Sequence, residues 1–317
     1  MIQRRFKMAQ NDHMEEKFNK RRFHLSDNAF AGLMLLPVFA ILVSVVFIPI
    51  IKGIYVSFCE YKISNLNAPV WNNFQNYIKV FKNGEVLIYF KNTFTYVFFS
   101  VGIQFVFGLA IALLLNQNMK ARGIFRGLFL IPWIIPSVVV AIVWTWMLQQ
   151  QFGVINYILY NLGITSTVNI SWTQQPFLAM MAVTMAAVWR QLPYMMVMIL
   201  AGLQSIDVSL TESAKIEGAN SWNLLRYITL PSIRPVITTS IWIAVMANFQ
   251  MFTIVFNMTG GGPVNATTTL SLAAHKKAFL EYDFGAGSTI GVLWLAVLFI
   301  ATLLYNKFND RYVSDYQ

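Results

Sequence analysis

Long apolar runs separated by short polar connections dominate this sequence. A membrane-spanning helix needs about 20 mostly apolar residues. Ala29–Ile51 and Thr93–Leu115 are runs of 23 residues each, and neither contains a charged residue. The pattern therefore predicts helices that cross a lipid bilayer.

A third stretch, from Gly127 to Trp189, has no charged residue over 63 positions. It is too long for one span and long enough for two spans joined by a polar connection at 149–176. Two further runs follow. The predicted spans are Ala29–Ile51, Thr93–Leu115, Gly127–Leu148, Phe177–Leu203, Val236–Met258 and Phe284–Asn306. We therefore expect an all-α integral membrane protein with six spans, five of them in a core at 93–306.

The distribution of Lys and Arg predicts the orientation, because these residues concentrate in cytoplasmic connections. With the N-terminus inside, the inner segments 1–28, 116–126, 204–235 and 306–317 hold 15 Lys and Arg, against 7 in the outer segments 52–92, 149–176 and 259–284. We expect both tails, 1–28 and 307–317, to be cytoplasmic, with 52–92 as an external loop. The run Ala29–Ile51 is too long for the apolar region of a signal peptide and is interpreted as an uncleaved span. This arrangement predicts a multi-pass membrane protein with both termini in the cytoplasm.

Composition narrows the function. Only 11% of residues are charged and 57% are apolar, which excludes an ordinary soluble enzyme. The net charge of +10 is spread between apolar runs, so we expect no nucleic-acid partner. Cys59 is the single cysteine and the three histidines are scattered, so we expect neither a metal site nor a catalytic cluster. The chain has no Walker-type sequence, and Gly260-Gly261-Gly262 is interpreted as an external turn.

The connection between spans four and five, 204–235, is longer than a simple link requires. Ser209 or Thr211 is expected to cap a helix that begins near Leu210 and ends at Gly218, where glycine supplies the left-handed conformation. A second helix is expected at Ser221–Tyr227, and Pro231 is expected to end it before span five. This pattern predicts a cytoplasmic helix-turn-helix for docking.

The same loop contains Glu212-Ser213-Ala214, three residues, Gly218, nine residues, Ile228, one residue, then Leu230-Pro231. It resembles the loop of permease subunits of binding-protein-dependent ABC importers, in which Glu-Ala-Ala, Gly and Ile-x-Leu-Pro occur at this spacing. Ser213 and Glu217 depart mildly from the family pattern. Further motifs resemble the carbohydrate branch, which includes the larger maltose permease subunit and shorter six-span sugar permeases. They are Leu130-Ile131-Pro132, Pro136-Ser137, Trp189, Pro193-Tyr194 and Thr259 to Pro263.

The resemblance implies a set of partners and a mechanism. A second permease subunit would complete the pathway, an external solute-binding protein would deliver substrate, and two ATP-binding subunits would carry ATP and magnesium. This chain itself would bind no cofactor. The residues implied in ATPase coupling are Glu212, Ser213, Ala214, Glu217, Gly218, Ile228, Leu230 and Pro231. The alternative interpretation of Glu212 is a solvated helix charge.

The resemblance also implies a substrate pathway formed by Trp133, Ser137, Arg190, Tyr194, Gln250 and Met251. Arg190 is the one cation within a predicted span, where burial is costly, so it is expected to face a cavity or a partner rather than to snorkel. Asn248, Gln250 and Asn257 are equally well interpreted as partners in interhelical hydrogen bonds. A shared cavity requires span three to tilt or break, which Pro132 and Pro136 favour.

The resulting expectation is a permease that imports a sugar or oligosaccharide. A glycerol-phosphate-type polyol is the alternative substrate, with Arg190 as an anion contact. A secondary transporter without an ATPase is a further alternative, but no inverted repeat is visible. A membrane-embedded enzyme is disfavoured by the lack of a catalytic cluster.

Overall fold

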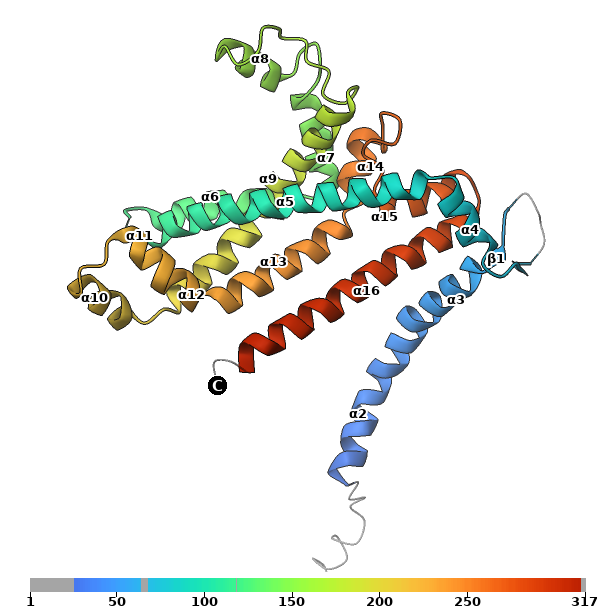
Figure 1. Ribbon diagram of the computed structural model, residues 1–317, viewed down its shortest axis with the longest axis horizontal. Coiled ribbons are helices and arrows are strands. Elements are labelled where there is room, and N and C mark those ends of the chain that lie inside the picture. Colours follow the sequence, from blue (N-terminus) through green and yellow to red (C-terminus); the bar gives the residue numbers. More distant parts are fainter. Residues whose placement is uncertain (1–25, 64–67, 118, 315–317) are drawn as a thin grey trace, which may run out of the picture. The chain divides into compact units, whose positions relative to one another are not determined.

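The computed structural model describes the backbone of residues 26–63, 68–117 and 119–314, which is almost entirely helical (Figure 1). The chain forms two units, 1–52 and 53–317, each of which is described by itself. Most of the predicted N-terminal tail, 1–28, lies outside the described residues.

The first apolar run forms a long helix without a break. It consists of α2 (Asp27–Leu42), the π-helical turn η2 (Val43–Phe47) and α3 (Ile48–Ser57). The stretch Phe30–Ser57 is long and apolar enough to span a membrane. Its apolar side chains are exposed from Phe30 to Tyr55, as lipid contact requires.

Three other single helices are long and apolar enough to span a membrane. They are α5 (Glu85–Asn116), α9 (Pro176–Gln204) and α16 (Phe284–Ser314), the last counted to Asn309. The helices predicted at Thr93–Leu115, Phe177–Leu203 and Phe284–Asn306 are therefore confirmed. Helix α5 starts within the segment 52–92 that was expected to be an external loop, because apolar residues from Val86 onward extend the helix toward its N-terminus.

The segment predicted as span three does not form one helix. Helix α6 (Arg122–Ile134) and helix α7 (Ser137–Met147) meet at an angle of 96°. A single helix over Gly127–Leu148 is therefore wrong. Of the two alternatives, tilt or break, the structure shows a break, which lies at Pro136, whereas Pro132 lies within α6. Ile135 is extended because the Pro136 ring disfavours the helical conformation in the residue before it.

The prediction of one continuous helix over Val236–Met258 is also wrong. Helix α13 (Arg234–Phe249) ends before Gln250, and a separate helix, α14 (Thr253–Thr259), follows. Neither Pro nor Gly causes this break. Instead α14 packs against α7 and α9, and this tertiary packing prevails over the local helical pattern.

The core of residues 53–317 lies where α5 packs along α9 and α13 crosses both. Gly108 on α5 permits the close approach, since a Cβ atom there would lie 2.8 Å from Cγ of Met195 on α9. Helices α13 and α16 meet through the stacked rings of Trp242 and Tyr305, whose centroids are 4.8 Å apart.

Short elements fill the connections. They are the antiparallel hairpin β1 (Cys59–Glu60) and β2 (Val70–Trp71), α4 (Gln75–Lys82), α8 (Val154–Asn161), α10 (Val208–Ile216), α11 (Ser221–Asn223), η3 (Leu224–Thr229), α12 (Leu230–Ser232), α15 (Leu270–His275) and η4 (Lys276–Leu280). Helices α10 to α12 gather at one end of this unit, and α4 and α15 lie at the other (Figure 1). The two ends of α5 therefore lie beside two different groups of connecting elements.

Candidate functional site

The loop between α9 and α13 is a helix-turn-helix whose first helix begins at a side-chain cap. Helix α10 starts after Asp207, whose Oδ1 accepts a hydrogen bond of 2.9 Å from the backbone N–H of Ser209. This bond stabilises the carboxylate and holds the pKa of Asp207 below its usual value. The expected caps, Ser209 and Thr211, are wrong. The Thr211 hydroxyl instead donates to the carbonyl of Val208 within the helix.

Gly218 ends α10 in the left-handed conformation, with φ of +88°. The N–H of Gly218 donates to the carbonyl of Lys215 at 3.1 Å, and the N–H of Ala219 donates to Ala214 at 2.9 Å. These two bonds form a Schellman motif, which satisfies the last free carbonyls of the helix. A left-handed residue at Gly218 is thus confirmed as the turn.

The second helix of the loop is longer than expected. It begins after Asn220, whose Oδ1 accepts from the N–H of Asn223 at 2.8 Å, and runs through a π-helical turn to Ser232. The expected end at Tyr227 is therefore wrong. The helix instead ends at Ser232, one residue after Pro231 and before α13, which agrees with the expectation that this proline stops it. The chain then bends by 69° at Ile233 to enter α13.

Most of the motif residues on this loop present their side chains to the outside. Glu212, Ser213, Glu217 and Pro231 are exposed, whereas Ala214 is buried at 7% exposure. Large apolar side chains on the same loop are also exposed: Val208, Leu210, Ile216, Trp222 and Tyr227. Ile216 is 86% exposed. A loop with this much apolar surface around two carboxylates suits a partner protein better than water.

Arg190 lies beside the break of span three. Its Nε donates a 3.3 Å hydrogen bond to the carbonyl of Ile135, one of the backbone groups released where α6 ends. A helix end within a membrane needs such a partner, because hydrocarbon offers none. Arg190 is half-buried, and its hydrogen bond to Ile135 shows that it contacts a neighbouring segment of the protein. Ser137 is the first residue of α7, two positions beyond the carbonyl that Arg190 binds.

Trp133 on α6 and Tyr194 on α9 are neighbours, with ring centroids 6.2 Å apart. Trp133 is half exposed. The Tyr194 hydroxyl is buried and has no hydrogen-bond partner among the described residues. Together with Arg190 and the start of α7, these rings form an aromatic and polar edge at the break.

A hollow of about 320 Å³ lies next to this edge, between α5, α6 and α9. Its walls are apolar and include Phe129, Pro132, Trp189 and Pro193. None of the six residues expected to form a substrate pathway lines this hollow. The polar side chains expected to contact substrate are thus found beside the hollow and not within it.

Gln250 and Met251 lie at the other break, between α13 and α14. Gln250 is exposed, and the carbonyl of Met251 accepts from the Ser271 hydroxyl at 3.4 Å. Neither a hydrogen bond nor a ring contact joins these two residues to Trp133, Arg190 or Tyr194. The two breaks are nevertheless connected, because α7 and α14, the helices that follow them, pack together. In Figure 1 both helices rise beside each other above α5.

A buried cluster of amides was missed by sequence reasoning. Nδ2 of Asn248 on α13 donates to Oε1 of Gln191 on α9 at 3.1 Å and lies 3.5 Å from Oε1 of Gln104 on α5. Asn248 thus forms the interhelical hydrogen bonds weighed for it above. An amide in the middle of an apolar run, such as Gln104, was the available signal.

The glycine turn after α14 is confirmed as a turn. Gly260 and Gly261 have positive φ, and the Thr268 hydroxyl donates to the carbonyl of Gly261 at 3.0 Å. Asn92 of α5 holds this segment from the side, since its Nδ2 donates to the carbonyls of Asn265 at 2.7 Å and Thr268 at 3.1 Å. Asn92 was not identified from the sequence, because its partners lie more than 170 residues away. Among the described residues, no group of His, Cys, Asp and Glu is suited to hold a metal ion.

Residues 104–314 match the family of binding-protein-dependent transport system inner membrane components. The chain belongs to this family. The matched residues include the break between α6 and α7, the helix-turn-helix loop and the glycine turn.

Curated relatives are similar over most of their length. The chain is 32% identical to a trehalose/maltose transport system permease protein of Thermococcus litoralis, over 87% of this chain and 92% of that protein. It is 30% identical to a sulfoquinovosyl glycerol transport system permease protein of Agrobacterium fabrum, over 90% and 92%. The family is therefore that of ABC-importer permease components in which relatives carry sugars, and such components are not themselves enzymes.

Among solved structures, a chain of a bacterial ABC transporter that imports the acidic polysaccharide alginate has the same fold. The TM-score is 0.77 at 22% identity, covering 89% of this chain and 95% of that chain. The alginate transporter has also been solved in complex with a periplasmic protein that carries an alginate pentasaccharide. At this identity the likeness shows the fold alone.

Proposed function

We propose that this chain is a pathway-forming permease subunit of an ATP-driven importer, and that it translocates a sugar or oligosaccharide delivered by an external solute-binding protein. The proposal includes six spans, of which α6 with α7 forms one and α13 with α14 forms another. It also places both termini in the cytoplasm. The observation that carries it is the helix-turn-helix loop, with Gly218 at the turn and its motif residues exposed, in a chain of the importer family.

The loop is proposed to dock into a cleft of an ATP-binding partner subunit. Glu212 supplies a charge-assisted contact to a basic residue, while Ile216 and Trp222 supply apolar area around it. ATP and magnesium bind to that partner and none to this chain. Because α13 begins directly after the loop, a shift of the loop moves the helix whose far end borders the second break. Transport then follows from the different contacts that the loop makes with and without ATP.

The substrate pathway is proposed to run past the aromatic and polar edge at the first break. Ring faces pack against the C–H surfaces of sugars, and donors such as the Tyr194 hydroxyl bind their hydroxyl groups. Trp133, Ser137, Arg190 and Tyr194 supply this edge, and Gln250 and Met251 contribute from the second break. A second permease subunit encloses the other side of the pathway.

Copurification tests the coupling role. The full chain, expressed with its importer partners, should bring down an ATP-binding subunit and a second permease subunit. Glu212→Ala should reduce ATPase recovery, with a loss on the order of 1–3 kcal/mol in association free energy. Glu60→Ala is a matched control, because Glu60 is also exposed and lies near the opposite end of the same unit. Normal ATPase recovery and normal uptake in Glu212→Ala would refute the docking role.

Uptake of radiolabelled ligands by proteoliposomes tests the substrate class. A maltose or trehalose series should compete for uptake, and Tyr194→Phe should weaken that competition without loss of the complex. Competition by glycerol phosphate alone would favour the polyol alternative, with Arg190 as the anion contact. Uptake that continues without the ATP-binding subunit would instead indicate a secondary transporter.

A further inference from the structure

The short helix α4 has an exposed apolar face that nothing in the proposed function uses. Phe74 directly precedes its first turn, and Ile78 and Phe81 follow at spacings of four and three residues, which places all three side chains on one face. Phe74 is 63% exposed, Ile78 62% and Phe81 46%. In water this face would be costly, because large apolar side chains gather there without cover.

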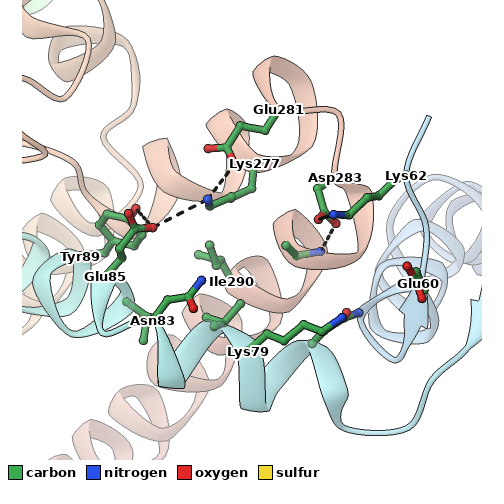
Figure 2. A pocket seen from close by; sticks show the side chains of 14 residues that line it. Glu60, Lys62, Lys79, Asn83, Glu85, Tyr89, Lys277, Glu281, Asp283 and Ile290 are labelled. Carbon is green, nitrogen blue, oxygen red and sulfur yellow. Dashed lines mark hydrogen bonds and ion pairs between the residues drawn. The ribbon is translucent and has the colours of Figure 1, made fainter. Parts of the chain in front are cut away.

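The opposite side of α4 is polar. Lys79 and Asn83 line a cavity of about 280 Å³ and point into it from the helix (Figure 2). Two charged pairs also line the cavity, with Lys62 Nζ 3.1 Å from Asp283 Oδ2 and Lys277 Nζ 2.7 Å from Glu281 Oε2. Such charges need water on the open side of the cavity. Helix α4 is thus amphipathic, with an apolar face on one side and a polar face on the other.

Helix α4 is fixed to its surroundings on the side between these two faces. Asn76 is buried, and its Nδ2 donates to the carbonyls of Ser57 at 2.9 Å and Cys59 at 2.7 Å. Helix α4 also packs against α5 and α16. These contacts fix the rotation of α4 about its axis, so the apolar face cannot turn toward the protein core.

The position of α4 in the chain gives its depth. The candidate span Phe30–Ser57 ends before it, and the candidate span Glu85–Asn116 begins three residues after Lys82. A helix between the ends of two spans lies where they leave the hydrocarbon. The exposed apolar surface continues directly into the first turn of α5 with Leu87 and Ile88, which are 60% and 45% exposed.

We propose that α4 is an interfacial helix, with Phe74, Ile78 and Phe81 inserted at the boundary between lipid headgroups and acyl chains and the charged cavity facing water. The hairpin before α4 supports this, since Trp71 is 53% exposed and stacks on Phe58 with centroids 5.4 Å apart. Trp and Tyr concentrate at this level of a bilayer. Exposed Lys82 on the flank of α4 reaches lipid phosphates by extending its aliphatic chain.

Spin-label accessibility tests the proposal. The full chain, with the subunits that copurify with it, is placed in nanodiscs of phosphatidylcholine and phosphatidylglycerol. Native Cys59 is changed by Cys59→Ser, and single labels follow from Ile78→Cys and Phe81→Cys on the apolar face. Lys79→Cys and Asn83→Cys are the matched controls on the same helix. Collision rates are measured with oxygen, which concentrates in lipid, and with a water-soluble nickel chelate.

The ratio of oxygen to nickel collisions should be several-fold higher at Ile78 and Phe81 than at Lys79 and Asn83. Equal ratios on both faces would overturn the proposal. Low collision rates with both reagents at Ile78 and Phe81 would also overturn it, because they would show a protein surface covering the face. Phe74→Cys provides a third apolar-face position if a label at Ile78 or Phe81 prevents recovery of the intact complex.

Discussion

The Nε atom of Arg190 on α9 donates a 3.3 Å hydrogen bond to the carbonyl of Ile135, the extended residue between α6 and α7. The bond joins the only cation predicted within a span to the point where another span breaks. A charged donor is well suited to a carbonyl that has lost its helical partner. Arg190 thus has a structural task at the break in addition to any contact with substrate.

Removing this donor should destabilise the break. Arg190→Met is expected to cost about 1.5–3 kcal/mol, because the Ile135 carbonyl is left without its charged donor. Thermal unfolding of the detergent-solubilised complex measures the loss. Arg190→Lys should recover part of it, since Lys keeps the charge but not the planar guanidinium. Lys91→Met, at an exposed position on α5, should leave the midpoint unchanged. If Arg190→Met is as stable as the parent, the bond is not a support of the break.

The turn at Gly218 should tolerate substitutions in order of their ability to adopt positive φ. A Cβ atom there meets no neighbour within 4 Å, so only the backbone conformation opposes it. The expected cost is about 1–2 kcal/mol for Ala, more for Val and less for Asn. Coupled ATPase activity in proteoliposomes should fall in the order Gly, Asn, Ala, Val, while insertion of the spans is unchanged. Gly123→Ala, in an open helical position, is the control. Equal activity of Gly218→Val and the parent would contradict the turn's role.

The cap of α10 should depend on pH. The hydrogen bond from the Ser209 N–H lowers the pKa of Asp207 in the folded protein. The cap therefore stabilises the helix fully above the unfolded pKa of about 4. This stabilisation is lost as the pH falls through the lower pKa of the folded state. Hydrogen exchange at Ser209 and Leu210 should therefore be slow from neutral pH to about pH 5 and lose its protection, relative to the intrinsic rate, in stronger acid.

Two variants complete the test of the cap. Asp207→Asn should keep the cap and remove its pH dependence, because Asn caps helices about as well as Asp. Asp207→Ala should lose protection at every pH. Loss of protection in Ser209→Ala or Thr211→Ala, but not in Asp207→Ala, would show that the cap lies elsewhere.

Asn92 should control the order of the glycine turn. Asn92→Ala removes two donors from the buried carbonyls of Asn265 and Thr268, with an expected cost of about 1–3 kcal/mol. Faster hydrogen exchange over residues 260–268 measures the effect. Asn257→Ala is the control, because its amide donates only to Thr253 within its own helix and is exposed. Unchanged hydrogen exchange in Asn92→Ala would show that the turn is ordered without the Asn92 side chain.

Orientation can be tested with an impermeant thiol reagent in intact cells. With Cys59 removed, Asn169→Cys should react and Asn220→Cys should react only after the cells are opened, because the excess of Lys and Arg places the second loop inside. Both positions are exposed, so access to the side chain is equal. Reaction of Asn220→Cys in intact cells would reverse the proposed orientation.

The length and apolar character of the runs were sufficient to predict four unbroken helices, since a 20-residue apolar run has few alternatives to a span. The break at Pro136 was also predictable, because proline restricts the residue before it. The break after Phe249 was not, since packing of α14 on α7 causes it and no local residue signals it. Within the loop, the Gly218 turn followed from its motif, but Asp207, Ser209 and Thr211 are all competent caps and only the fold selects one.

The Arg190 bond also bears on how the protein is made. Helices α6 and α7 have 13 and 11 residues, so neither half can cross a bilayer alone, and together they leave the Ile135 carbonyl unsatisfied. Its donor lies 55 residues later in the chain, on the next span. We therefore expect span three to settle in lipid only after span four has emerged from the ribosome. The two are expected to enter the membrane as a pair, and in a chain truncated before Arg190 the third span should stay bound to the insertion machinery.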